Sequence, residues 1–210
     1  MGAALKAEVL NKKAAINCLY QVGNDLYVDA CNLHVQDGTG DSLSSDMVPN
    51  GLGNLIVGYN EEGPGGSEKT GSHNVIVGPY HTYTNQSGLV TGKSNKITGL
   101  GAAVTGGKNN KASAHWSTVS GGSSNWASGE NSSVSGGYGN KASGPRSSVS
   151  GGLSNTASVD VSSVTGGFNN EASGAACSVS GGAGNIASGY MSSVSGGLQN
   201  VAEGQYETLP

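Results

Sequence analysis

Seven valines recur at intervals of fifteen residues through the second half of the chain, and this period restricts the possible folds more than any other feature. Each valine is followed two residues later by a glycine pair, six residues later by an asparagine and eight residues later by an alanine. The valines are Val104, Val119, Val134, Val149, Val164, Val179 and Val194, and the asparagines are Asn110, Asn125, Asn140, Asn155, Asn170, Asn185 and Asn200. So short a unit, S-V-S-G-G-x-x-N-x-A-S-G-x-x-S, predicts a solenoid in which each repeat forms one turn.

Side-chain alternation along a strand predicts which residues of a turn point inward. Val134 lies on one face of a short strand, with Ser133 and Ser135 on the other. After the glycine bend, Asn140 and Ala142 share a face. We expect valine, asparagine and alanine to form continuous internal columns, with each asparagine amide bonded to the amide of the next turn, because an unpaired buried amide is costly.

Looser copies of the unit extend the repeat toward the N-terminus. Leu89 falls one period before Val104, Val75 falls fourteen residues earlier, and Leu55 begins the first turn. An insertion of roughly ten residues, Glu61 to Thr70, is expected to bulge out before the second turn. The sequence therefore predicts an all-β parallel β-roll of about ten turns over residues 55–204, followed by a C-terminal tail at 205–210.

The residues before the repeats have a different pattern. Leu5, Val9, Ile16 and Leu19 form an apolar stripe that predicts a short, coiled-coil-like helix within residues 1–22. This helix would either align several chains or cap the first turn of a single chain. Residues 23–54 are expected to form a cap and a polar loop, with short strands at 25–29 and 32–35, because solenoid ends need capping.

Composition and charge narrow the functional classes. With 37 glycines, 5 % aromatic and 11 % charged residues, the chain cannot fill a wide core. The net charge of −4 shows no basic patch that would indicate nucleic acid as a partner. No apolar run approaches the roughly 18 residues of a membrane segment. Three distant cysteines, Cys18, Cys31 and Cys177, indicate neither a disulfide framework nor a zinc site, and their role stays open.

Comparison of the outward-facing columns suggests a surface for packing. The positions that flank the valines hold mainly Ser and Thr, whereas the column containing Lys111, Trp126 and Lys141 varies freely. A face kept small and flat is a candidate for contact between subunits, and exposure to solvent is the alternative. Its residues include Ser133, Ser135, Ser148, Ser150, Ser163 and Thr165.

No catalytic, cofactor-binding or metal-ligating residues are predicted. The glycine pairs lack the lysine of a phosphate-binding loop, and the four histidines lack metal-ligand spacing. Trp116 and Trp126, close to His115, are a candidate surface for stacking on a sugar ring or anchoring a partner. Isolated outward aromatic residues are the alternative interpretation.

The unit V-S-G-G-x-x-N-x-A-S-G resembles the V-A-I-G-x-x-S-x-A-x-G repeat of YadA-like trimeric autotransporter adhesin heads over residues 55–204. The resemblance implies a left-handed β-roll, a homotrimer, a location outside the cell or on its surface, and no enzymatic activity. It implies binding to extracellular matrix, a glycan or another cell-surface ligand.

Two further functions compete with this interpretation. Regular Ser and Thr ranks on a flat sheet are also compatible with an ice-binding solenoid, although Ser rather than Thr dominates here. A carbohydrate-processing enzyme on a parallel β-helix is disfavoured, because its turns would be longer and carboxylates would cluster on one face.

Overall fold

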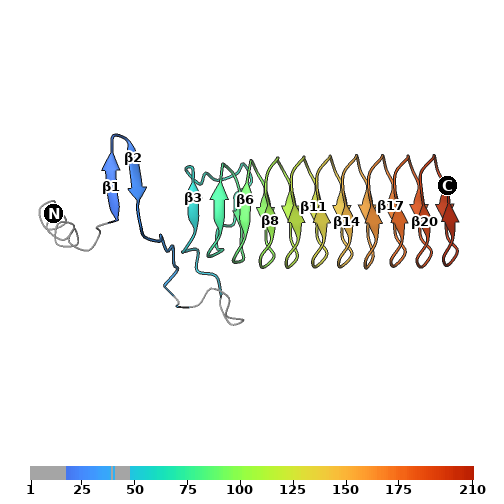
Figure 1. The fold of residues 1–210 in the computed structure, drawn as a ribbon, viewed down its shortest axis with the longest axis horizontal. Coiled ribbons are helices and arrows are strands. Elements are labelled where there is room, and N and C mark those ends of the chain that lie inside the picture. Colours follow the sequence, from blue (N-terminus) through green and yellow to red (C-terminus); the bar gives the residue numbers. More distant parts are fainter. Residues whose placement is uncertain (1–17, 39, 41–47) are drawn as a thin grey trace, which may run out of the picture. The chain divides into compact units, whose positions relative to one another are not determined.

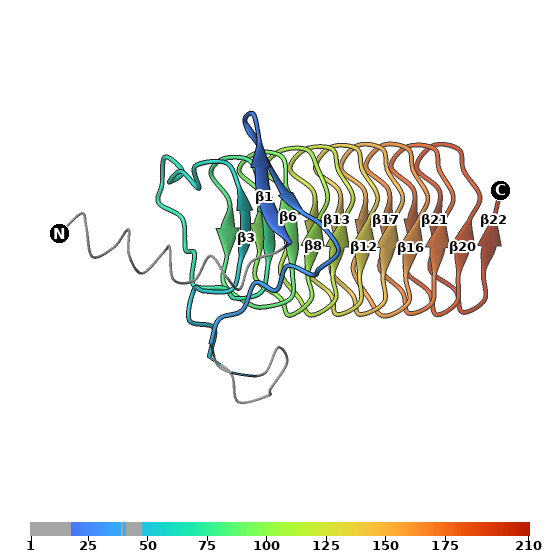
Figure 2. The ribbon, with the colours of Figure 1, turned by 60° about the vertical axis from the view of Figure 1, so that its left-hand side comes forward.

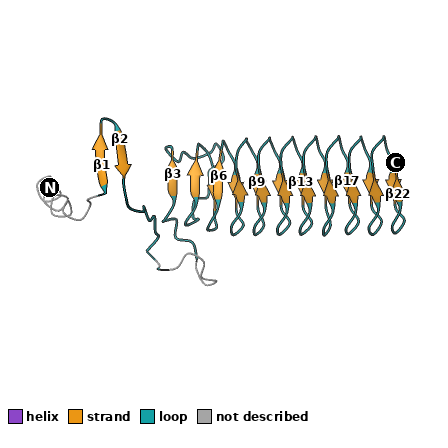
Figure 3. Cartoon of the chain, viewed as in Figure 1, coloured by secondary structure: helices purple, strands orange, loops and turns teal. Residues whose placement is uncertain are grey.

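The computed structural model describes residues 18–38, 40 and 48–210, which contain strands, turns and loops but no helix (Figures 1 and 3). The chain divides into two compact units, one ending at Val35 and the other comprising Gln36–Pro210. The first unit contains a two-stranded hairpin, and the second contains the repeats.

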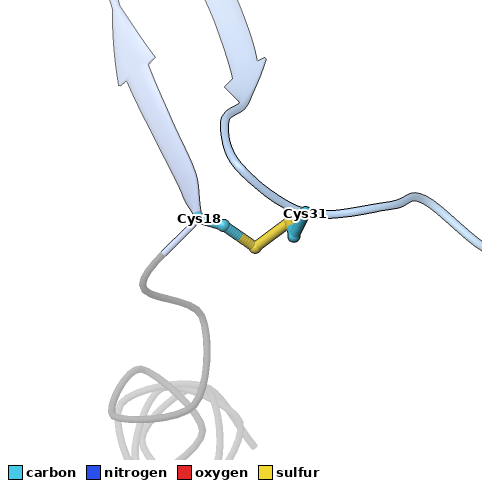
Figure 4. The surroundings of a disulfide bond; sticks show 2 residues. All are labelled: Cys18 and Cys31. Carbon is cyan, nitrogen blue, oxygen red and sulfur yellow. A yellow bond between two sulfur atoms is a disulfide. The ribbon is translucent and has the colours of Figure 1, made fainter.

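The hairpin pairs β1 (Leu19–Val22) with β2 (Asp25–Val28) in antiparallel register. A disulfide joins Cys18 to Cys31 at the open end of the hairpin (Figure 4). The rings of Tyr20 and Tyr27 stack across the two strands with 5.2 Å between centroids. Cross-strand aromatic contact and the disulfide both stabilise a motif that is marginal by itself in water.

Several predictions for this N-terminal region are wrong. Most of the helix expected within residues 1–22 lies outside the described residues, but Leu19 and Tyr20 belong to a strand. Residues 32–35 form no strand. No disulfide was predicted from the cysteine spacing, but the structure pairs Cys18 with Cys31. The turn between β1 and β2 brings these two cysteines, thirteen residues apart, together.

The second unit is a parallel β-solenoid of about nine turns, where about ten were predicted, and it confirms the all-β parallel solenoid inferred from the repeat (Figure 2). Its larger sheet, here called the valine sheet, has eleven parallel strands: β3 (Leu55–Val57), β4 (Val75–Val77), β6 (Leu89–Thr91), β8 (Ala103–Val104), β10 (Thr118–Val119), β12 (Ser133–Val134), β14 (Ser148–Val149), β16 (Ser163–Val164), β18 (Ser178–Val179), β20 (Ser193–Val194) and β22 (Thr208–Leu209).

The second sheet, the alanine sheet, has nine parallel strands: β5 (Thr82–Tyr83), β7 (Lys96–Ile97), β9 (Lys111–Ala112), β11 (Trp126–Ala127), β13 (Lys141–Ala142), β15 (Thr156–Ala157), β17 (Glu171–Ala172), β19 (Ile186–Ala187) and β21 (Val201–Ala202). Between the sheets, one residue of each turn bridges to the next turn. This bridge column comprises Lys93, Lys108, Ser123, Tyr138, Leu153, Phe168, Ala183 and Leu198.

Identical positions of successive turns are direct neighbours in both sheets. Val134 pairs with Val119 and Val149, and Ala142 pairs with Ala127 and Ala157. The seven repeat valines and the alanines of β9 to β21 are buried and face one another across a thin core. Burial of one valine side chain contributes about 1.5–3 kcal/mol, so the repetition of a small contact stabilises a rod without large side chains.

The asparagines also lie inside, but their bonding differs from the amide-to-amide ladder that we expected. The Oδ1 atom of Asn140 accepts the backbone N–H of Asn155 at 2.9 Å. Its Nδ2 atom donates to the carbonyls of Gly136 and Gly152, at 2.8 and 2.9 Å. The amide therefore bonds backbone groups of the glycine bend and of the next turn, and the carbonyl of Gly152 also accepts the backbone N–H of Tyr138 at 3.0 Å.

The register of the first turns differs from the prediction. Val90 and Ile76 occupy the buried valine column, whereas Leu89 and Val75 lie one position away. These turns have fourteen residues because Gly78 and Gly92 each stand alone where later turns have a glycine pair. Larger residues, Tyr83 and Ile97, fill the alanine positions of these turns.

The insertion lies between β3 and β4, as predicted, and Ile56 pairs with Ile76 across it. The C-terminal end of the repeat region differs from the prediction. Residues 205–210, expected as a tail, form a turn and the last strand, β22, which pairs with β20. Leu209 takes the valine position in that strand and packs against the core.

Candidate functional site

Since the inward residues are occupied by packing, the residues available for binding lie on the outer faces of the solenoid. The outer face of the valine sheet carries the small residues identified in the sequence. Ser133, Ser148 and Ser163 are half-buried, whereas Ser135, Ser150 and Thr165 are exposed. Within the described residues of this one chain, the face is a row of small side chains with hydroxyl groups open to solvent.

The two tryptophans occupy different environments. Trp116 lies in the turn that leads into β10, with a φ of 58°, and its ring lies against Gly101 of the preceding turn. Trp126 lies on the outer face of β11, where its Nε1–H donates to the Ser113 hydroxyl at 2.8 Å. His115 is exposed beside Trp116. The aromatic pairs in contact within the described residues are Tyr20–Tyr27 and Tyr190–Tyr206, so no ring contact joins the two indoles.

Trp126 is flanked by cations. The ammonium group of Lys111, one turn before, lies 4.5 Å from the centroid of its ring, and that of Lys141, one turn after, lies 5.0 Å away. The two lysines come from the turns on either side of Trp126, and both ammonium groups lie over its ring. Trp126 keeps 37 % of its surface exposed, and its role as a surface for stacking stays a prediction.

The structure gathers lysines that sequence reasoning treated as scattered. Lys96 pairs in register with Lys111, and Lys93 bridges to Lys108. Together with Lys141 they form what we call the lysine patch, on the outer alanine sheet and the adjacent bridge column. The net charge of the chain does not reveal this patch. It could have been found in the sequence by aligning the outward-facing positions of successive turns.

An apolar stripe follows the same bridge column further along the rod. Tyr138, Leu153, Phe168 and Leu198 are all exposed, and Ala183 lies between the last two. Monomeric soluble proteins seldom expose long contiguous apolar surface, which usually marks an interaction site. The column was not singled out in the sequence because its position between the sheets became evident only with the bridge pairing.

The buried titratable groups have structural explanations. Cys177 fills a column that holds buried serines such as Ser162 and Ser192, and burial raises the pKa of its thiol, which disfavours the nucleophilic thiolate. His81 replaces an asparagine of the internal column, and burial lowers the pKa of its imidazole. His73 lies 3.5 Å from Asp37 near the start of the solenoid. The described residues contain no cluster of three or more metal-ligating side chains.

Comparison with known protein families gives a match to a short segment of the solenoid. A family model of the ubiquitous surface protein adhesin repeat matches residues 162–174, a segment that contains β16 and β17. One turn of the solenoid is thus similar to an adhesin repeat. This similarity supports repeats of the trimeric autotransporter adhesin kind, and it does not extend to the YadA head motif in particular. The search of curated proteins found no match.

Proposed function

We propose that this chain is a non-enzymatic segment of a surface fibre, a left-handed β-roll that assembles as a head-like homotrimer and presents a binding surface outside the cell. The observation that carries the proposal is the combination of an adhesin-type repeat with a rigid parallel solenoid. Constant inner columns maintain the rod while the outer columns vary, which is the division of roles expected of a scaffold that presents ligand-binding side chains.

The disulfide supports the location outside the cell. Cys18 and Cys31 are bonded in a small, exposed hairpin. Disulfides persist in oxidising compartments and at cell surfaces, and they are rare in reducing cytosol. The described part of the chain holds no helix of the length and apolarity that a membrane span requires.

Two outer surfaces support assembly of several chains. The serine-rich face of the valine sheet is flat enough for close approach, and the neighbouring apolar stripe would be removed from water by packing between subunits. The proposed interface therefore includes the face around Ser133, Ser148 and Ser163 together with Leu153 and Phe168.

Light scattering of the purified chain tests this proposal. We expect a mass three times the 20.7 kDa of one chain, and a one-chain mass would contradict the trimer while leaving the solenoid intact. The double variant L153S/F168S should shift the mass toward the single chain, because it removes apolar surface from the proposed interface. The solenoid should still fold, because Ser123 already occupies the bridge column. Tyr190→Ser, an exposed aromatic residue outside the stripe, is the matched control and should leave the mass unchanged.

Adhesion is tested separately by binding of the purified rod to immobilised matrix proteins and to whole cells. We expect saturable binding that the L153S/F168S variant weakens through loss of avidity, since a trimer presents three copies of each site. Failure to bind any surface, with the trimer intact, would leave the chain a structural fibre segment without an adhesive role.

A further inference from the structure

The lysine patch stands out against the acidic character of the chain. Its five members are half of the ten lysines and arginines in a protein whose net charge is −4. They come from three turns and lie on two adjacent outer columns: Lys93, Lys96, Lys108, Lys111 and Lys141.

Like charges are direct neighbours within this patch. Lys96 and Lys111 are register partners in the alanine sheet, and Lys93 and Lys108 are partners in the bridge column. Adjacent strands lie about 4.8 Å apart, so the stems of each pair start at that spacing. Like charges in direct register destabilise a sheet, and an external anion bound to both ammonium groups would relieve this repulsion.

Carboxylates do not neutralise the patch. No Asp or Glu occurs between Glu68 and Glu130, a stretch that contains four of the five lysines. The lysine and arginine ion pairs within the described residues are Lys69–Glu62 and Arg146–Asp160, and neither involves the patch. In the alanine sheet the nearest acid of the same column, Glu171, lies two turns beyond Lys141.

Trp126 holds the patch together across the one turn that lacks a lysine in this column. Its ring lies between Lys111 and Lys141 and is hydrogen-bonded to Ser113, which fixes its orientation. Attraction of an ammonium group to an indole face contributes about 0.5–1 kcal/mol at an exposed site. Trp126 is thus a positioning residue that extends a row of cations along the rod.

We propose that the lysine patch binds a linear polyanionic polysaccharide, a glycan carrying sulfate or carboxylate groups along its length. This inference rests on the proposed function and names its ligand class. A row of cations parallel to a rod matches a ligand whose charges repeat along a chain. Lys96, Lys111 and Lys141 lie on the alanine sheet, whereas the serine-rich face assigned to subunit packing lies on the valine sheet.

Two observations favour a glycan over a nucleic acid. Single-stranded nucleic acids bind through bases stacked on free aromatic faces, whereas the ammonium groups of Lys111 and Lys141 already lie over the Trp126 ring. The disulfide between Cys18 and Cys31 indicates an oxidising compartment, where polysaccharides are the abundant polyanions.

The test measures binding of the full chain to heparin, hyaluronan, neutral dextran and single-stranded DNA at several salt concentrations. We expect binding to heparin that weakens steeply with salt, as displacement of counterions requires, and no binding to dextran. The double variant K96Q/K111Q should bind heparin at least tenfold more weakly. Trp126→Thr, which introduces the residue found at Thr156 of the same column, should weaken it about threefold.

The matched control is K69Q/R146Q, which removes two positive charges outside the patch. It should bind heparin as tightly as the wild type. An equal loss of heparin affinity in both double variants would show that binding depends on net charge alone, which would overturn the proposal. Tighter binding of DNA than of heparin at the same salt, or no binding to heparin or hyaluronan, would overturn it as well. Thermal unfolding of each variant verifies that the solenoid is intact.

The oligomeric state separates this inference from the proposed function. A trimer that binds neither heparin nor hyaluronan would refute the glycan site but not the proposed assembly. A single chain that binds heparin through Lys96 and Lys111 would refute the trimer and leave the lysine patch as a binding site.

Discussion

The glycines of each pair, which look equivalent in the sequence, have different roles. Gly137 has a φ of 85°. A Cβ there would clash with the carbonyl oxygen of Gly152 and would lie 2.5 Å from the side-chain nitrogen Nδ2 of Asn140. Gly136 has no atom within 4 Å of the same point, and its φ is not positive. The second glycine is therefore required by both backbone conformation and the proximity of the next turn.

Alanine substitutions in this pair should have opposite outcomes. Gly137→Ala is expected to destabilise the solenoid by about 2 kcal/mol or more, because it strains the turn and disrupts the Asn140 bonds. Gly136→Ala is expected to be neutral or stabilising by up to about 1 kcal/mol, because it restricts only the unfolded chain. Urea unfolding of both variants measures the difference, and equal stability would contradict the close approach of the turns.

At the scale of the structural elements, the asparagine column contains one histidine, His81. Its ring, like an asparagine amide, accepts a backbone N–H of the next turn and donates to a backbone carbonyl. The Nδ1 atom of His81 accepts the backbone N–H of Asn95 at 3.1 Å, and its Nε2–H donates to the carbonyl of Val77 at 3.1 Å. Asn95 in turn accepts the N–H of Asn110. Only a neutral imidazole can both accept and donate in this way.

This arrangement makes the stability of the first turns dependent on pH. Burial lowers the pKa of His81 in the folded state below that of the unfolded chain, about 6.5. Stability from the neutral ring is thus complete above about pH 6.5 and declines as pH falls toward the folded pKa, with a slope of at most about 1.4 kcal/mol per pH unit. No carboxylate contributes to the pKa of His81, and the nearby cation, Lys93, lies over the Tyr80 ring.

Thermal unfolding between pH 8 and pH 5 tests this dependence. His81→Asn, which restores the residue of the later turns, should lose less stability on acidification than the wild type. His115→Asn, at an exposed position, is the control and should follow the wild type. Identical pH profiles for H81N and the wild type would show that His81 is not part of the ladder.

At the scale of the whole molecule, the chain consists of two units stabilised by different means. The hairpin of the first unit depends on one covalent bond, whereas the solenoid depends on repeated small contacts between neighbouring turns. In such a quasi-one-dimensional unit, stability is approximately a sum over turns and their interfaces.

Reduction of the disulfide should therefore affect one unit only. A closed loop of this size contributes about 3 kcal/mol, which exceeds what two short strands provide. We expect dithiothreitol to increase hydrogen exchange at residues 19–28 and to leave the melting temperature of the solenoid unchanged. The variant C177S, which places serine in its serine column, removes any contribution of the buried thiol. A fall in the melting temperature on reduction would contradict the division into independent units.

How far the sequence alone predicts this protein depends on whether a property is local to one turn. Val134, Asn140 and Ala142 could be placed inside because strand alternation and a fifteen-residue period are properties of the chain itself. The shift to Val90 was missed because a single missing glycine changes the register without changing the apolar pattern. The disulfide was missed because it depends on how a hairpin folds back.

The sequence by itself determined the parallel solenoid and its internal columns, since a regular repeat of small buried residues can be satisfied only by stacking identical turns. The tertiary structure alone decided which outer side chains lie together: the lysines around Trp126, the stripe from Tyr138 to Leu198 and the backbone bonds of the asparagines. The physical reason is that stacking converts a separation of fifteen residues into a contact of about 4.8 Å, so surfaces arise across turns and not along the chain.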